Sequence, residues 1–226
     1  MHGGPILIFI LFAALVVVGI IYSILAAKKR REELAALAAR LGLSFSTEQD
    51  PTLAGQFGFL DQLAQGSNRY AFNVLRGGYR SQEVLVFDYH YETHSTDSKG
   101  RRQTHHHYFS FFILLLPLSF PELKITREGL FSKLAQAFGY ADIDFESAEF
   151  SRAFCVRSKD KRFAYDVCHA QMMEYLLANG DLSIEIEGRA LALAFDSRLS
   201  AAEIEANLQR LLEVRSRLPE YLFTQT

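Results

Sequence analysis

Histidine is the residue type whose spacing most suggests chemistry. Of the seven histidines, five fall within an 18-residue stretch and are His90, His94, His105, His106 and His107. Alternating apolar and polar residues predict two antiparallel strands here, joined by a polar loop at 95–103. Successive side chains of a strand point to opposite faces, so the pairing register decides which histidines meet.

Two registers of this hairpin are considered. If His94 pairs with Thr104, Glu92 lies opposite His106, and His90, His94 and His106 share one face. If His94 pairs with His105 instead, His105 and His107 take the place of His106. In either register two or more imidazoles and a carboxylate converge.

Neutral imidazole is a good ligand for zinc, copper or nickel, and three N/O ligands with an open position suit a labile or catalytic site. The sequence therefore offers His90, His94 and His106 as a candidate metal site, with zinc as the candidate metal. The alternative is a solvated polar face beside a charged loop that holds Lys99, Arg101 and Arg102. The sequence favours this alternative, so no cofactor is expected.

An acidic group and two cysteines are further candidates for a binding or catalytic site. Asp142, Asp144 and Glu146 alternate along an expected strand and could hold a hard cation, but a solvated acidic face is the preferred interpretation. Cys155 and Cys168 lie thirteen residues apart, match no zinc spacing and are expected to be thiols in a reducing cytoplasm. Phosphate-loop, nucleophile-elbow and dinucleotide motifs are absent from the sequence. No catalytic residue is assigned, and the enzyme class is weakened without being excluded.

The N-terminal segment predicts where the protein resides. Residues 5–27 form an uncharged apolar run of 23 residues, about 34 Å long as a helix, which exceeds a hydrocarbon core of about 30 Å. A cleaved signal peptide would carry its basic residues before a shorter apolar stretch. Here the basic residues follow the run, as Lys28, Lys29, Arg30 and Arg31. We expect a retained transmembrane helix.

The same basic cluster predicts topology, because positive flanks stay on the cytoplasmic side. We expect a single-pass protein of the cell membrane with residues 1–4 outside and the C-terminal domain in the cytoplasm. The four cations could also contact anionic lipid heads of the bilayer. Gly19, Ser23 and Ala27 repeat at four-residue intervals, which would permit a homodimer through close helix contact.

The remaining pattern predicts an α+β domain with a mostly antiparallel sheet and packed helices. A basic juxtamembrane helix is expected at 28–42, a strand-rich subdomain at 43–120 and an α+β subdomain at 121–226. A meander is expected over 70–116 with a turn at Gly77-Gly78, a helix at 127–138, a hairpin turning at Gly188, and a last helix opened by a capping box from Ser200 to Glu203.

Two stretches carry a family resemblance. FESAEFSRAFCVRSKDKRFAYDVCHAQMMEYLLA at 145–178 and LSIEIEGRALALAF at 182–195 resemble an uncharacterised bacterial family of membrane-anchored proteins known only as a domain of unknown function. FLDQLAQGSNRYAFNVLRGG and VLVFDYHYETH extend the likeness to about residues 57–195. The resemblance implies a membrane-tethered cytoplasmic module and implies no catalytic or binding residue.

Charge and motifs together give two hypotheses. Apart from the four basic residues after the apolar run, the chain has 20 basic and 26 acidic residues, so a nucleic-acid partner is not expected. The main hypothesis is a non-catalytic interaction or scaffold module, with the bilayer and another membrane protein as partners. The second is a metal-binding sensor or hydrolase that uses the histidine-rich hairpin at 88–107.

Overall fold

A long N-terminal helix precedes the body of the protein. The structure is a computed structural model that describes residues 3–127 and 142–224. Helix α1 runs without a break over Gly3–Leu41, and Gly42 ends it at a φ of +71°, which glycine adopts without strain. Its segment Ile10–Leu41 is long and apolar enough to cross a membrane, and none of its most apolar window is buried.

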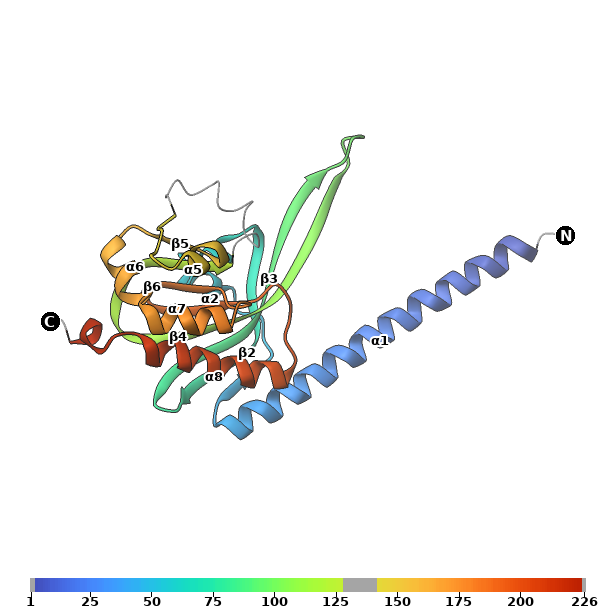
Figure 1. Cartoon of the computed structure of the whole chain (residues 1–226). Helices are drawn as coiled ribbons and strands as arrows, with labels where there is room; N and C mark the ends of the chain where they lie inside the picture. The colour runs from blue at the N-terminus through green and yellow to red at the C-terminus, as the bar shows by residue number, and fades with distance from the viewer. Residues whose placement is uncertain (1–2, 128–141, 225–226) are drawn as a thin grey trace.

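One six-stranded sheet forms the centre of the body (Figure 1). The strands are β1 (Ser44–Ser46), β2 (Ser67–Tyr79), β3 (Gln82–Thr96), β4 (Arg102–Arg127), β5 (Phe154–Ser158) and β6 (Ile184–Ala194). They follow the order β1-β2-β3-β4-β5, with β6 also paired to β4, and all of these pairings are antiparallel. The predicted fold class is therefore confirmed.

Strand β4 organises the sheet. Its residues 111–115 lie between β3 and β6, and its residues 123–125 lie between β5 and β6. It continues through residue 120, so the division expected between 43–120 and 121–226 falls inside a strand. The body shares this strand across both expected subdomains.

Helices cover both faces of the sheet. They are α2 (Pro51–Gln56), α3 (Asp61–Ala64), α5 (Ala148–Ala153), α6 (Lys161–Val167), α7 (Ala170–Ala178), α8 (Ala201–Arg217) and the 3-10 helix η1 (Glu220–Phe223). On one face, Leu34 and Leu37 of α1 join α7 and α8 in the larger core cluster. On the other face, α2 and α3 pack Leu53 and Leu63 against the aromatic residues of β3 and β4. The capping box predicted at Ser200 is confirmed.

The helix expected at 127–138 lies outside the described residues except for Arg127. The two turns predicted at Gly77-Gly78 and Gly188 are wrong. Strand β2 continues past Gly77-Gly78, and the chain turns at Arg80-Ser81, where φ is +48° and +65°. Two consecutive positive φ values match the twist of the hairpin, although neither residue is a glycine. Gly188, at φ +56°, lies within β6, at a register irregularity opposite Phe120, and makes no hairpin.

The β3–β4 hairpin reaches beyond the other strands. Strand β2 pairs with β3 only as far as Glu92, and β6 begins to pair with β4 only at Phe111. Residues 91–107, called the arm below, therefore extend from the body. Beyond the Ser67–Glu92 pair they form a two-stranded ribbon of β3 and β4. In Figure 1 the arm and the N-terminal half of α1 project from the same side of the body.

Candidate functional site

The first of the two registers considered for the histidine hairpin is observed. His94 pairs with Thr104, Glu92 with His106, and His90 with Tyr108. The root of the arm therefore carries His90, Glu92 and His106 on one face.

The side chains of His90, Glu92 and His106 form a cluster. The Nε2 atom of His90 lies 3.1 Å from Nδ1 of His106, and the latter lies 3.5 Å from Oε1 of Glu92. One potential ligand atom from each residue falls within 4.8 Å of the other two. His94 stands outside this group, because its ring lies 3.2 Å from both the Ser67 and the Thr104 hydroxyls. Glu92 thus occupies the place that the sequence had offered to His94.

Asn68 on the neighbouring strand orients two members of the cluster. Its carbonyl oxygen lies 3.0 Å from Nδ1 of His90, and its amide nitrogen donates to Oε1 of Glu92 at 2.6 Å. Asn68 sits where the register of β2 shifts, at a φ of +48°. A bulge aims backbone groups in directions that a regular ladder does not allow, and Asn tolerates this φ better than most residues.

The environment of the cluster favours an uncharged imidazole beside a carboxylate. Burial lowers the pKa of His90, and the hydrogen bond from Asn68 lowers the pKa of Glu92. The ring of His90 also lies 4.5 Å from that of Tyr70 and 4.8 Å from that of Tyr108. The cluster therefore favours a neutral His90 imidazole beside an anionic Glu92 carboxylate.

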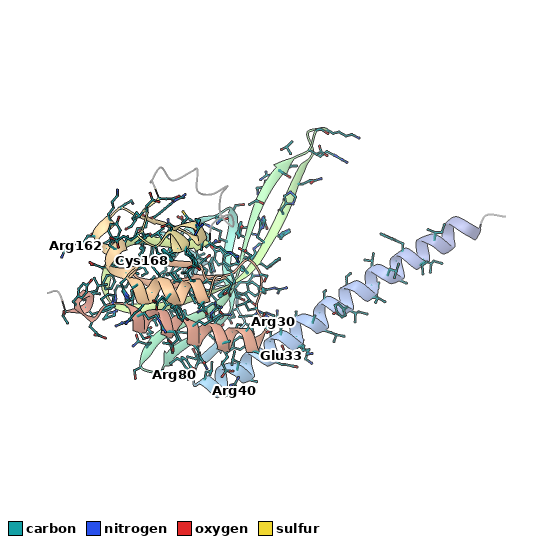
Figure 2. All side chains as sticks on the ribbon, viewed as in Figure 1. Arg30, Glu33, Arg40, Arg80, Arg162 and Cys168 are labelled. Atoms are coloured by element: carbon teal, nitrogen blue, oxygen red, sulfur yellow. The ribbon has the colours of Figure 1, made fainter. Side chains whose placement is uncertain are left out.

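A second feature joins α1 to the sheet. Arg30 donates from Nε and Nη2 to the two carboxylate oxygens of Asp88, at 2.8 and 2.7 Å, and from Nη1 to the Leu199 carbonyl at 2.7 Å. The Asp88 side chain is 1% exposed and also accepts from Asn73 and Ser110. Arg30, which the sequence grouped with the membrane-flanking cations, is therefore paired where α1 meets the body, with 17% of its side chain exposed (Figure 2).

The other three cations of that group remain at the surface. Lys28 and Lys29 each lie 3.8 Å from a glutamate one turn further along α1, with side chains more than 70% exposed. Arg31 is also exposed. Gly19, Ser23 and Ala27 lie on the exposed part of α1, and the homodimer through them stays a prediction.

A buried charge cluster escaped the sequence analysis. Lys124 contacts Asp61 at 2.5 Å, Glu122 at 2.6 Å and Glu185 at 3.6 Å. Burial raises the pKa of Glu185 to about 8, and the surrounding carboxylates raise that of Lys124 to about 12. Alternation along β6 sends Glu185 to the face opposite Ile184 and Ile186, and α3 covers that face and donates the Asp61 N–H to the Glu185 carboxylate.

The remaining candidates are occupied by local contacts. Asp142 lies 2.9 Å from Arg157 and accepts from the thiol of Cys155 at 2.8 Å. Cys168 is buried, and burial raises the pKa of its thiol to about 12, which opposes thiolate formation. His169 donates from Nε2 to the Arg217 carbonyl.

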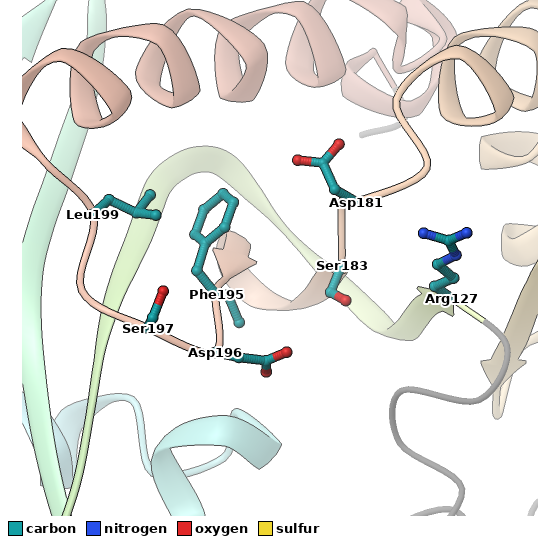
Figure 3. Close-up of a pocket in the computed structure, with 8 residues that line it drawn as sticks. Arg127, Asp181, Ser183, Phe195, Asp196, Ser197 and Leu199 are labelled. Atoms are coloured by element: carbon teal, nitrogen blue, oxygen red, sulfur yellow. The ribbon is translucent and has the colours of Figure 1, made fainter.

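One pocket lies at the end of β6 (Figure 3). Its 270 Å³ volume is below the range of about 300–1,000 Å³ typical of small-molecule sites. Polar residues and the apolar Ala194, Phe195 and Leu199 line it, and Asp181 is held by Arg210 at 2.7 Å.

Together these features define an α+β body with a rigidly attached apolar helix and a polar, histidine-rich arm. No family model and no curated protein matches the chain. A solved structure, the mycobacterial trehalose monomycolate transport factor A (TtfA), is similar at 12% identity and a TM-score of 0.58, over 84% of this chain and 96% of that one. At this identity the likeness concerns the fold alone. The resemblance seen over residues 57–195 stays a prediction.

Proposed function

We propose that this protein is a non-catalytic, single-pass membrane-anchored module that presents its arm to another membrane protein. The observation that carries this proposal is the Arg30–Asp88 ion pair. It joins α1 to the sheet only three residues after the apolar run ends at Ala27.

The rigid attachment is the main argument. A flexible linker raises the local concentration of a domain without setting its orientation. Here α1 continues from the apolar segment into the core, where Leu34, Leu37 and Ala38 are at most 2% exposed. A body attached in this way keeps one face towards the bilayer. A fixed orientation is useful when that face binds a partner at the membrane.

The arm is the part of the body best suited to such a contact. It is largely exposed, it leaves the body on the same side as the apolar half of α1, and its tip carries Lys99, Arg101 and Arg102. Asp97 accepts from the Arg101 side chain at 2.8 Å and so offsets one of these charges. A net positive tip favours an acidic surface on the partner.

Topology and the similar fold fit this role. With Arg30 occupied, Lys28, Lys29 and Arg31 still form a basic flank, so we keep the orientation with the body in the cytoplasm. The structure of similar fold belongs to a protein described as a trehalose monomycolate transport factor. An accessory role beside a membrane protein is consistent with that description.

The test places a photo-crosslinking amino acid at Lys99 or Arg102 in cells, and at the exposed Tyr221 as a matched control far from the arm. We expect a discrete adduct with an integral membrane protein from the arm positions and none from Tyr221. Adducts with lipid alone, or equal adducts from Tyr221, would contradict the proposal.

A linker variant separates orientation from concentration. About ten Gly and Ser residues inserted between Ala27 and Lys28 leave the anchor and the Arg30–Asp88 pair intact but free the body to rotate. We expect the adduct from the arm to disappear in this variant. An undiminished adduct would mean that tethering alone is sufficient and that the rigid attachment has no role in binding.

A further inference from the structure

We propose that His90, Glu92 and His106 form a binding site for a divalent transition metal of the zinc class at the root of the arm. This inference is independent of the proposed partner, because the arm could contact a membrane protein with or without a metal. It differs from the sequence expectation in one ligand, since Glu92 replaces His94.

The separations between the donor atoms suit a tetrahedral ion. Metal–nitrogen and metal–oxygen bonds of about 2.0–2.1 Å place two ligand atoms roughly 3.3–3.4 Å apart at a tetrahedral angle. The His90–His106 separation is 3.1 Å, and the His106–Glu92 separation is 3.5 Å. These two separations are within a few tenths of an ångström of the tetrahedral value, and the third, between His90 and Glu92, is within 4.8 Å. An ion would take the place of the hydrogen bond between the imidazoles.

The ligands are also held as metal ligands usually are. A ligating histidine commonly donates its second ring N–H to a carbonyl, which leaves the other nitrogen free to coordinate. The Asn68 carbonyl accepts from Nδ1 of His90 in this way and leaves Nε2 facing His106. The Asn68 amide meanwhile holds Oε1 of Glu92. One residue at a backbone bulge thus orients two of the three ligands.

The site is closed on one side and open on the other. His90 is 1% exposed, whereas the side chain of His106 is 52% exposed and that of Glu92 is 16% exposed. An ion could enter past His106, and its fourth position would face solvent and take water. Three protein ligands with one open position are the pattern of exchangeable zinc sites.

Occupancy would have a structural effect on the arm. The ligands come from β3 and β4, so the ion would join the two strands where β6 no longer pairs with β4 and β2 makes its last pairs with β3, at His90 and Glu92. Metal binding would thus stiffen the arm where it leaves the body.

The test uses full-length protein in detergent with an affinity tag that contains no histidine. After removal of metal with a chelator, Zn²⁺ is titrated in competition with a chromophoric chelator. We expect one equivalent per chain, weakened roughly 100-fold or more in His106→Ala and in Glu92→Gln. Asn68→Gly keeps the positive φ and the carbonyl but removes the amide, and we expect it to weaken binding by about 10- to 100-fold.

Two histidines serve as matched controls. His105 lies one residue away on the opposite face, where it contacts Ser95, and His94 lies beyond the cluster. His105→Ala and His94→Ala should bind Zn²⁺ within about threefold of the wild type. Because His106 and Glu92 lie towards the surface, their variants should keep the circular dichroism spectrum of the wild type. If His106→Ala loses that spectrum, His106→Gln replaces it in the titration.

Two results would overturn the site. The first is a wild-type protein that binds Zn²⁺ no better than His106→Ala does. The second is an equal loss of affinity in His105→Ala, which would mean that the ion is held by the histidine-rich surface in general. Neither result bears on the crosslinking test, so the two proposals can fail separately.

Discussion

Replacing Arg30 with methionine should destabilise the body far more than any change at its basic neighbours. The substitution keeps an unbranched side chain of high helix propensity but removes three hydrogen bonds, two to Asp88 and one to the Leu199 carbonyl. Asp88 is then left buried with only Asn73 and Ser110 as donors. Loss of one partner from a buried ion pair costs about 3–5 kcal/mol, because the remaining charge is uncompensated.

The neighbouring Lys29 supplies the matched control. Its side chain is 79% exposed and lies 3.8 Å from Glu33, so Lys29→Met should change stability by less than about 0.5 kcal/mol. Asp88→Asn combined with Arg30→Met removes the uncompensated charge. The double variant should therefore be more stable than Arg30→Met alone by about 1–2 kcal/mol.

Thermal unfolding of the full chain in detergent measures these differences. The protein has ten tyrosines and no tryptophan, so near-ultraviolet circular dichroism of tyrosine reports tertiary packing. For a chain of this size, 1 kcal/mol shifts Tm by about 2–4 °C, so Arg30→Met should lower Tm by roughly 10 °C. An Arg30→Met variant that unfolds within about 2 °C of Lys29→Met would refute the reasoning and return Arg30 to the surface group.

Three further predictions concern the sheet and its attachment. Burial raises the pKa of Glu185 to about 8, so the native state keeps a proton that the unfolded state releases above about pH 4.5. The free energy of unfolding should therefore fall as pH rises from about 5 to 8. Glu185→Gln should flatten this pH dependence in a series of urea unfolding experiments. Gly66→Ala would bring a Cβ within 2.7 Å of the Tyr91 ring at a φ of +63°. We expect the free energy of unfolding in urea to fall by about 3 kcal/mol or more, and a fall below about 1 kcal/mol would contradict the geometry. Leu37→Ala empties a core position that is 2% exposed and should cost about 2–5 kcal/mol in the same assay, whereas Leu25→Ala, on the 59% exposed part of α1, should leave the unfolding of the body unchanged.

The predicted metal site shows where sequence reasoning stops. Strand alternation placed His90 and Glu92 on one face but left two pairing registers open, and the structure has the one that pairs His94 with Thr104. Two contacts with β2 decide which side chains converge. Asn68, at the bulge of β2, hydrogen-bonds to Glu92 and orients it towards the cluster, whereas Ser67 hydrogen-bonds to His94 and keeps it out of the cluster. These contacts cross from β2 to β3, and no local pattern encodes them.

Arg30 illustrates the same limit for charge. By sequence it is one of four equivalent cations after an apolar run, and the positive-inside rule treats all four alike. Its partner Asp88 lies 58 residues away on a central strand. Only the packing of α1 against the sheet decides that this one cation pairs with a buried carboxylate.

The sequence by itself determined the features that depend on neighbouring residues. These are the apolar N-terminal helix, the cap at Ser200, the antiparallel meander and the α+β class, because hydrophobic period and capping act over a few residues. Only the tertiary structure decided that β4 runs across the expected division, that Gly188 makes a bulge and no turn, and that Glu185 is buried beneath α3. The physical reason is that burial and ion pairing are set by whichever distant segment covers a side chain, and this choice minimises the free energy of the whole packed body rather than that of any local segment.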